Sequence, residues 1–207
     1  MKRFVVAGIG TDVGKTIASA VLTEALQSTY WKPVQAGNLD NSDRMTVQQL
    51  AGPDCYVLEE RFLLKTPASP HLAAELDGET ISLNDLKLPH LHDHESLVVE
   101  TAGGIMVPLN EDGLLFADLI AEWKLPVMLV TRHYLGSINH TLLSLSELKN
   151  RGITIAGLII NGERHEPSER IYRKLYPELE FFFLPELKEL NQYIISKLGQ
   201  QWREQLG

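Results

Sequence analysis

A glycine-rich segment directly follows the first apolar run of this chain and constrains the fold more than any other feature. The apolar run covers residues 4–7, and residues 8–16 read Gly-Ile-Gly-Thr-Asp-Val-Gly-Lys-Thr. A strand, a loop and a helix N-terminus in this order form an anion site, because backbone N–H groups and the positive end of the helix dipole converge there. The segment therefore predicts a nucleoside triphosphate site, with Lys15 on the outer phosphates and the Thr16 hydroxyl on Mg²⁺.

The predicted loop is a longer variant of the usual phosphate-binding motif. That motif places its first glycine five residues before the glycine of Gly-Lys-Thr. Ile9 occupies this position here, and Gly8 lies one residue too early. The alternative is a chance Gly-Lys-Thr within a glycine-rich turn, which we do not favour because strand, loop and helix fall in the required order.

Composition indicates one globular domain over residues 1–207. Hydrophobic residues make up 44% and charged residues 22% of the chain, and the net charge of −8 argues against a nucleic-acid-binding surface. The single cysteine, Cys55, excludes an internal disulfide and suits a reducing cytosol. We find no apolar stretch long enough for a signal peptide or a membrane span. We therefore expect a cytoplasmic protein with no membrane or nucleic-acid partner.

Apolar, strand-like runs alternate along the chain with segments of helical periodicity. Strands are predicted at residues 4–7, 96–100, 126–131, 153–160 and 181–184, with a further short strand ending at 32–34. Helices are predicted at residues 15–27, 41–51, 70–76, 115–123, 138–148, 167–176 and 191–202, the second capped by Asn41 or Ser42. The alternation predicts an α/β fold, a single doubly wound, mostly parallel sheet with helices on both faces, as in P-loop NTPases.

Polar residues follow or end several of these strands. They are Gly8, Lys32, Glu100, Thr131 and Asn161. Because ligands of doubly wound sheets bind just outside the carboxyl ends of the strands, residues far apart in the sequence can converge there on one crevice.

Two carboxylates and one lysine are candidates for chemistry in that crevice. Glu100 ends an apolar strand, where a buried carboxylate needs a partner, and with Asp43 and Thr16 it forms a plausible Mg²⁺ site of hard oxygen ligands. Spacing alone also allows Asp43 to be a helix cap or first-turn acid. Lys32 is either a cation for charge that develops in phosphoryl or acyl transfer, or a solvated loop lysine.

Three further segments contain candidate residues. Residues 135–140, Leu-Gly-Ser-Ile-Asn-His, open a helix whose N-terminus suits a substrate carboxylate, although capping by Ser137 or Asn139 is an alternative that can coexist. The three histidines of residues 90–94 lie on a polar loop without neighbouring ligands, so we do not predict a metal site there. For Arg132 and His133, contact with phosphate or substrate and simple exposure both remain open.

An ordered set of motifs resembles the dethiobiotin synthetase family over nearly the whole chain. The motifs are Thr-Asp-Val-Gly-Lys-Thr (11–16), Lys-Pro-Val-Gln-Ala-Gly (32–37), Asn-Ser-Asp (41–43), Pro-Ala-Ser-Pro-His (67–71), Glu-Thr-Ala-Gly-Gly (100–104), Phe-Ala-Asp (116–118), Leu-Pro-Val (125–127), Leu-Gly-Ser-Ile-Asn-His (135–140) and Ala-Gly (156–157) leading to Asn161. Each is weak alone, but the ordered set is specific.

The resemblance implies an ATP-dependent carboxylation and ring closure in biotin biosynthesis. In this reaction 7,8-diaminopelargonate, CO₂ (from bicarbonate) and ATP give dethiobiotin, ADP and phosphate. One substrate amine forms a carbamate, ATP converts the carbamate to a carbamic-phosphoric anhydride, and the second amine closes the cyclic urea. Mg²⁺ is the implied cofactor, and a homodimer is the implied assembly.

The resemblance also implies roles for residues that match the family's motifs. The implied catalytic residues are Lys32 and Lys15, and the implied Mg²⁺ ligands are Thr16, Asp43 and Glu100. The implied ATP-binding residues are Asp12, Val13, Gly14, Lys15, Thr16, Ile17, Asp43, Glu100, Thr101, Ala102, Gly103, Asn161, Gly162, Pro185, Glu186 and Leu187. The implied substrate-binding residues are Thr11, Lys32, Ala36, Ser69, Pro70, Ser137, Ile138, Asn139 and Tyr172. Asn161 would read the adenine edge, and Tyr172 is the nearest candidate for a tyrosine contributed by the other subunit.

This chain departs from the family pattern at a few places. Ile9 and Gly10 replace polar residues of the phosphate loop, Ala36 replaces a serine or threonine, and Thr101 replaces a glycine. The C-terminal region is also shorter than in many members, which affects the adenine side. None of these departures removes a charge that the implied mechanism needs.

Two other ATPase classes share parts of the pattern. The ATPase domains of corrin amidotransferases take ammonia from a fused glutaminase with a nucleophilic cysteine, but the one cysteine here lies in Gly-Pro-Asp-Cys. Partitioning ATPases of the ParA and MinD type carry an extra lysine early in the phosphate loop, and residues 8–10 contain none. We therefore favour the synthetase.

Overall fold

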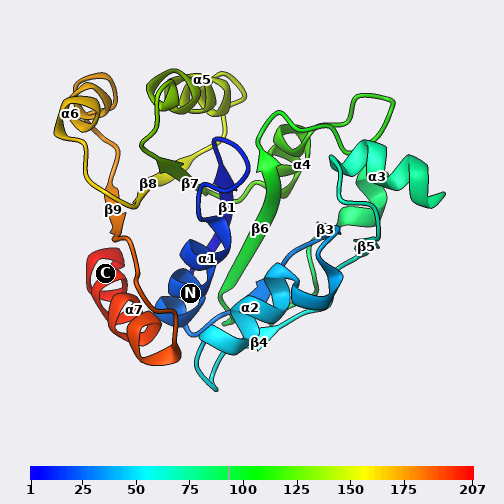
Figure 1. Ribbon diagram of the computed structural model, residues 1–207, viewed down its shortest axis with the longest axis horizontal. Coiled ribbons are helices and arrows are strands. Elements are labelled where there is room, and N and C mark those ends of the chain that lie inside the picture. The colour runs from blue at the N-terminus through cyan, green and yellow to red at the C-terminus, as the bar shows by residue number, and fades with distance from the viewer. Residues whose placement is uncertain (93) are drawn as a thin grey trace.

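A seven-stranded sheet, in which every neighbouring pair of strands is parallel, runs through the centre of the molecule (Figure 1). The computed structural model describes residues 1–92 and 94–207. The strand order is β4-β2-β6-β1-β7-β8-β9. The strands are β1 (Arg3–Gly8), β2 (Thr29–Trp31), β4 (Tyr56–Val57), β6 (Leu97–Gly104), β7 (Val127–Arg132), β8 (Ile155–Asn161) and β9 (Phe181–Leu184).

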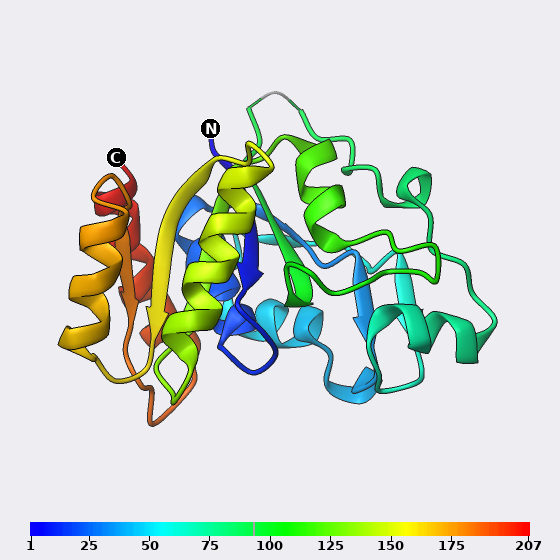
Figure 2. The same cartoon turned by 90° about the horizontal axis from the view of Figure 1, so that it is seen from above.

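Helices cover both faces of this sheet, so the predicted doubly wound α/β fold is confirmed. On one face, α1 (Lys15–Leu26), α2 (Asp43–Leu50) and α7 (Gln192–Leu206) share an apolar cluster. On the other face, α4 (Phe116–Trp123), α5 (Ser137–Asn150) and α6 (Glu166–Leu175) share a second one. Figures 1 and 2 show helices on both sides of the sheet. Successive side chains of β1 enter the two clusters alternately, Val5 one and Val6 the other, as the period of a strand requires.

A small second sheet beside the main one differs from the prediction of a single short strand ending at residues 32–34. The chain leaves β2 after Trp31 and starts β3 (Val34–Ala36), which pairs in parallel with β5 (Phe62–Leu64). Pro33 lies at the break, where it has no N–H for a ladder, and its carbonyl accepts hydrogen bonds from the backbone of Arg61 and Phe62. Figure 2 shows this sheet and α3 (Pro70–Asp77) to one side. Strands β4 and β5 were not predicted.

Several element ends differ from the predicted ones. Strand β6 continues to Gly104, which pairs with Gly8, so Glu100 lies inside its strand rather than at its end. Ser42, not Asn41, caps α2, because its Oγ accepts a hydrogen bond from the Met45 N–H at 3.3 Å. Short 3₁₀ turns at Leu39–Asn41 and Leu83–Leu86 were also not predicted. In the described part of the chain, no helix is long and apolar enough to cross a membrane.

Candidate active site

The loop between β1 and α1 takes the conformation of a phosphate cradle. Gly14 precedes α1 with a φ of 96°, a left-handed conformation that favours glycine. The loop is fastened to the sheet by Asn161, whose Nδ2 donates a hydrogen bond of 3.0 Å to the Val13 carbonyl oxygen. A β-carbon on Gly14 would lie 2.2 Å from that same Nδ2. The glycine is therefore required both by its backbone conformation and by the close approach of Asn161.

Lys15 lies folded into the loop rather than extended into solvent. Its Nζ donates a hydrogen bond of 2.7 Å to the Gly10 carbonyl oxygen, and the residue is only 7% exposed. Burial lowers the pKa of Lys15 to about 8, although the Glu100 carboxylate opposes the shift. Phosphate oxygens near this ammonium would favour its charged form and oppose the effect of burial.

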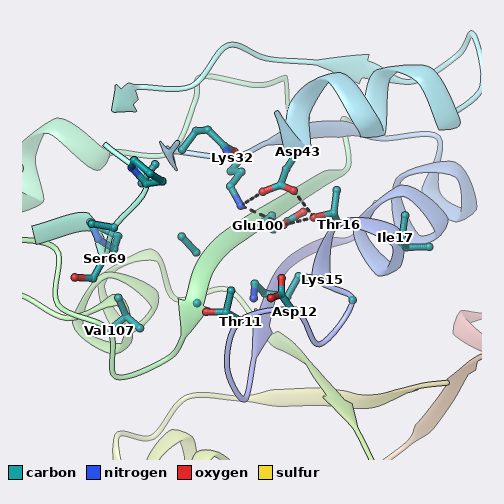
Figure 3. A pocket seen from close by; sticks show the side chains of 18 of the residues that line it. Thr11, Asp12, Lys15, Thr16, Ile17, Lys32, Asp43, Ser69, Glu100 and Val107 are labelled. Atoms are coloured by element: carbon teal, nitrogen blue, oxygen red, sulfur yellow. Dashed lines mark hydrogen bonds and ion pairs between the residues drawn. The ribbon is translucent and has the colours of Figure 1, made fainter. Parts of the chain in front are cut away.

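Four side chains meet beside the loop, from α1, α2, β6 and the break between β2 and β3 (Figure 3). The Lys32 Nζ lies 2.6 Å from an Asp43 oxygen and 3.2 Å from Glu100 Oε1. The Thr16 hydroxyl donates to Asp43 at 2.6 Å and is 3.1 Å from the same Glu100 oxygen. Lys32 and Glu100 are almost wholly buried, at 3% and 1% exposure. Of the strand-end residues predicted to converge, Lys32 and Glu100 meet here, although Glu100 lies inside β6. Thr131 does not join them, because it is buried and its hydroxyl lies 2.8 Å from that of Thr141.

The charges of this cluster support one another. Burial alone would lower the pKa of Lys32, but the carboxylates of Glu100 and Asp43 outweigh it and raise that pKa. Burial would raise the pKa of Asp43, but the Lys32 ammonium outweighs it and lowers that pKa. The lysine is therefore a buried cation held between two anions and not a solvated loop residue. Asp43 is not the cap of α2, but it is an acid of the first turn of that helix and contacts Lys32 from there.

The cluster offers the oxygen donors that Mg²⁺ prefers. A hydroxyl and two carboxylates point toward one another, and in this structure a cation, the Lys32 ammonium, already lies against both carboxylates. Mg²⁺ keeps several waters in such sites and needs only one or two carboxylates. In the described residues, no group of three or more His, Cys, Asp and Glu side chains lies close enough to hold a metal ion, which leaves this oxygen-donor cluster as the candidate.

A pocket of about 710 Å³ opens from the cluster. It is lined by most of the predicted nucleotide and substrate residues, namely Thr11, Asp12, Gly14, Lys15, Thr16, Ile17, Lys32, Ala36, Asp43, Ser69, Pro70, Glu100, Ala102, Gly103 and Asn161. It is also lined by five residues that were not predicted to line it, namely Gln35, Pro67, Ala68, Val107 and Arg132. Gln35, Pro67 and Ala68 lie inside motifs that carry the family resemblance, and this position could have marked them as pocket residues. Nothing in the sequence marks Val107.

A shallow groove of about 150 Å³ continues from this pocket past Asn161. Its lining includes the predicted residues Ile17, Gly162, Pro185, Glu186 and Leu187. Arg132 lies between the two spaces and approaches Glu186, with 3.8 Å between their charged atoms. The side chains of Val13 and Thr101, in contrast, are buried, so these two residues can contribute only backbone atoms to a ligand.

Known proteins resemble this chain along most of its length. A protein family described as "AAA domain" matches residues 2–193. The ATP-dependent dethiobiotin synthetase BioD of Afipia carboxidovorans is 50% identical over 190 residues, which cover 91% of this chain and 90% of that protein. The protein of the same name from Christiangramia forsetii is 43% identical over 206 residues, or 99% of this chain and 98% of that one. This chain belongs to the dethiobiotin synthetase family.

Membership of the dethiobiotin synthetase family disfavours a partitioning switch and a corrin amidotransferase, although the fold is shared more widely. A ParA family ATPase from Chlorobium tepidum has a TM-score of 0.58 and 13% identity to this chain, and the match covers 98% of each chain. The cell division ATPase MinD of Pyrococcus furiosus matches over the full length of both chains, with a TM-score of 0.57 and 15% identity. At these identities the likeness shows the fold alone.

A second, larger hollow of about 940 Å³ lies at the N-terminus of α5. The predicted residues Ser137, Ile138 and Asn139 line it, together with Arg132, which it shares with the main pocket. Gly136 is the N-cap of α5 and no side chain caps the helix, so capping by Ser137 or Asn139 is not what this structure shows. The Ser137 hydroxyl instead accepts a hydrogen bond from the Tyr134 N–H at 3.2 Å.

Tyr172 does not fit its predicted role in binding substrate across a subunit interface. The residue is wholly buried, and its hydroxyl lies 3.4 Å from that of Thr141 in α5. Helical periodicity on α6 turns this tyrosine toward the core, where no second subunit can reach it. Tyr134, 45% exposed beside the α5 N-terminus, is a tyrosine that another subunit can reach.

A buried ion pair shapes the far wall of this hollow. The Glu169 carboxylate is fully buried and accepts two hydrogen bonds from the Arg164 guanidinium and one from the His165 N–H. Burial would raise the pKa of Glu169, but Arg164 outweighs it and lowers that pKa. His133 stacks on Tyr172, and its Nε2 lies 3.6 Å from Glu169, so this histidine belongs to the same network.

We expect Arg164→Ala to lower the free energy of unfolding by about 1 to 3 kcal/mol at pH 7, because it leaves the Glu169 charge buried without its main partner. The loss should shrink as the pH falls, since a carboxylate with a lowered folded-state pKa stabilises the protein above its unfolded pKa and not below its folded one. Denaturant unfolding of both proteins at pH 7 and pH 4 measures this. The control is Arg170→Ala, at an exposed residue next to Glu169 on α6. An equal loss of unfolding free energy at both pH values for Arg164→Ala would contradict the argument.

Proposed function

We propose that this protein catalyses the ATP-dependent conversion of 7,8-diaminopelargonate and CO₂ to dethiobiotin, ADP and phosphate. The observation that carries the proposal is the cluster of Lys32, Asp43, Glu100 and Thr16 at the phosphate loop, within one pocket that has room for both a triphosphate and a second ligand. The family assignment supplies the reaction. We also propose that residues 1–207 act as one domain in the cytoplasm.

The phosphate loop and Lys15 would hold the triphosphate. Backbone N–H groups of residues 12–16 surround its β- and γ-phosphates, and the Lys15 ammonium leaves the Gly10 carbonyl oxygen for a phosphate oxygen. Thr16, Asp43 and Glu100 would hold Mg²⁺, which when bound neutralises charge on the phosphates. Asn161 and the groove formed with residues 185–187 would take the adenine. Most of the catalysis then comes from positioning and charge, as in other phosphoryl transfers.

Lys32 would stabilise the reacting group itself. It is a buried ammonium on the pocket wall, between the carboxylates and the small second sheet. The carbamate carries negative charge, and when its oxygen attacks the γ-phosphate, charge is redistributed over the transferring phosphoryl oxygens. A fixed cation at that point stabilises the transition state more than the ground state. The raised pKa of Lys32 keeps it charged at neutral pH.

The far end of the diamine substrate would extend from this pocket toward α5. Ala36, Ser69 and Pro70 form the wall opposite the phosphate loop. The uncapped N-terminus of α5 has free N–H groups for the substrate carboxylate. Leu135 is fully exposed and Ile138 38% exposed beside that helix start, and we propose that a second copy of the chain covers them in a homodimer.

A product assay tests this function directly. Purified protein is incubated with ATP, Mg²⁺, bicarbonate and 7,8-diaminopelargonate, and dethiobiotin is detected by mass spectrometry alongside phosphate release. We expect one phosphate for each cyclic urea formed, and no product without the diamine. Phosphate release that depends on the diamine but yields no cyclic urea would overturn the proposal.

A further inference from the structure

Glu100 receives hydrogen bonds on both of its carboxylate oxygens, and the two oxygens face different groups. Its Oε1 lies 3.2 Å from the Lys32 ammonium and 3.1 Å from the Thr16 hydroxyl. Its Oε2 accepts a hydrogen bond of 2.9 Å from the Tyr30 hydroxyl. In the described part of the chain, Tyr30 is the one side chain that donates to Oε2. The carboxylate is therefore oriented by a contact on each side.

Tyr30 cannot follow the carboxylate if it turns. The residue is fully buried, and its ring belongs to the apolar cluster that includes Val21 of α1 and Val47 of α2. Tyr30 pairs with Val98 across β2 and β6, and Glu100 is two residues further along β6, on the same face of the sheet. The hydroxyl thus reaches Glu100 along the same face of the sheet, and Tyr30 itself does not line the pocket.

From this geometry we propose that Tyr30 is a positioning residue for the divalent cation site. By holding Oε2 in its hydrogen bond, Tyr30 leaves Oε1 facing Thr16, where the proposed function places the cation; the inference rests on that function. Without the hydroxyl, Oε2 loses its donor in a buried place, and the carboxylate gains by turning both oxygens toward the Lys32 ammonium. The divalent cation then binds a less well oriented Glu100 carboxylate and competes with a Lys32 ammonium that holds this carboxylate more strongly.

The test compares Tyr30→Phe with wild type in binding Mn²⁺ alone, without nucleotide or substrate. Free Mn²⁺ is followed by electron paramagnetic resonance. We expect binding about tenfold weaker in the variant, the lower end of the range for loss of a side chain that orients a metal ligand. The phenylalanine retains the ring packing, so we expect the variant to fold, which far-ultraviolet circular dichroism checks. Tyr56→Phe, at a 71% exposed tyrosine on the neighbouring strand β4, is the matched control and should bind as wild type.

A kinetic measurement separates positioning from a structural role. At saturating ATP and diamine, the Mg²⁺ concentration for half-maximal rate should rise in Tyr30→Phe, while the KM for the diamine stays within about twofold. If Tyr30→Phe lowered only the melting temperature and bound Mn²⁺ as wild type does, the proposal would be overturned. Failure of the proposed function is distinguishable, because it would appear as absence of dethiobiotin in the wild-type product assay while the Mn²⁺ comparison still stood.

Discussion

Lys32→Met should reduce dethiobiotin formation by about 100- to 1,000-fold, the range for removing one preorganised charge from a transition state. Nucleotide binding should change far less, because the phosphate loop and Lys15 are untouched. The reason is the placement of Lys32, whose buried ammonium lies 2.6 Å from Asp43 and 3.2 Å from Glu100 on the pocket wall. A longer or neutral side chain cannot reproduce that placement, so Lys32→Arg should also be strongly impaired.

The measurement pairs single-turnover product formation with ADP binding by calorimetry at high Mg²⁺. High Mg²⁺ matters because the variant leaves two carboxylates without their internal cation, and a divalent ion can then neutralise them. Lys197→Met, an exposed lysine on α7, is the control for the loss of one positive charge. A Lys32→Met variant that forms dethiobiotin at the wild-type rate would remove Lys32 from the mechanism.

Gly14→Ala should weaken ATP binding by about 100-fold, or roughly 3 kcal/mol. The added methyl group would lie 2.2 Å from Asn161 Nδ2 and 2.8 Å from its Cγ, so Asn161 must move and its hydrogen bond to Val13 is lost. Alanine is also strained at a φ of 96°. Both effects act on the same loop, and we expect a fall in unfolding free energy of about 1 to 3 kcal/mol as well, typical of an overpacked site.

Gly10→Ala is the matched control for this substitution. A β-carbon at Gly10 would meet no described heavy atom within 4 Å, and its carbonyl, which receives the Lys15 hydrogen bond, is kept. ATP affinity is measured by calorimetry and stability by thermal unfolding for both variants. Equal effects of Gly14→Ala and Gly10→Ala would show that loop flexibility, rather than the close approach of Asn161, explains the loss.

Local patterns predicted most strands of the main sheet and the position of the glycine-rich loop between β1 and α1. Strongly apolar runs such as residues 126–131 become buried parallel strands, and the order of strand, loop and helix at residues 4–16 fixes where a phosphate can bind. Thr16, Lys32, Asp43 and Glu100 were identified singly. Their meeting depends on β2, β6 and β1 lying side by side. The rule for strand ends in doubly wound sheets predicted convergence on one crevice, but it did not predict this order of strands.

Long-range contacts account for what the sequence did not predict. Strands β4 and β5 have two and three residues, too few to produce a period, and they form only because β2 and β3 offer them an edge. Tyr172 was chosen as the nearest match to a family tyrosine, and its burial on the inward face of α6 depends on tertiary packing. The contact of Tyr30 with Glu100 joins neighbouring strands almost 70 residues apart in sequence, and nothing local to either residue marks it.

Because β1 lies between β6 and β7 in the sheet, it can pair only after these later strands have been synthesised. This strand ends at Gly8 and emerges first, but its two neighbours begin only at Leu97 and Val127, so it must wait unpaired while half the chain is made. Asn161, which fastens the nucleotide loop, emerges later still. A nascent chain that ends before Asn161 therefore carries the whole phosphate motif but lacks the residue that fastens the nucleotide loop. We therefore expect no stabilisation by ATP in the early stages of folding. The nucleotide site therefore forms only after β8 has joined the sheet.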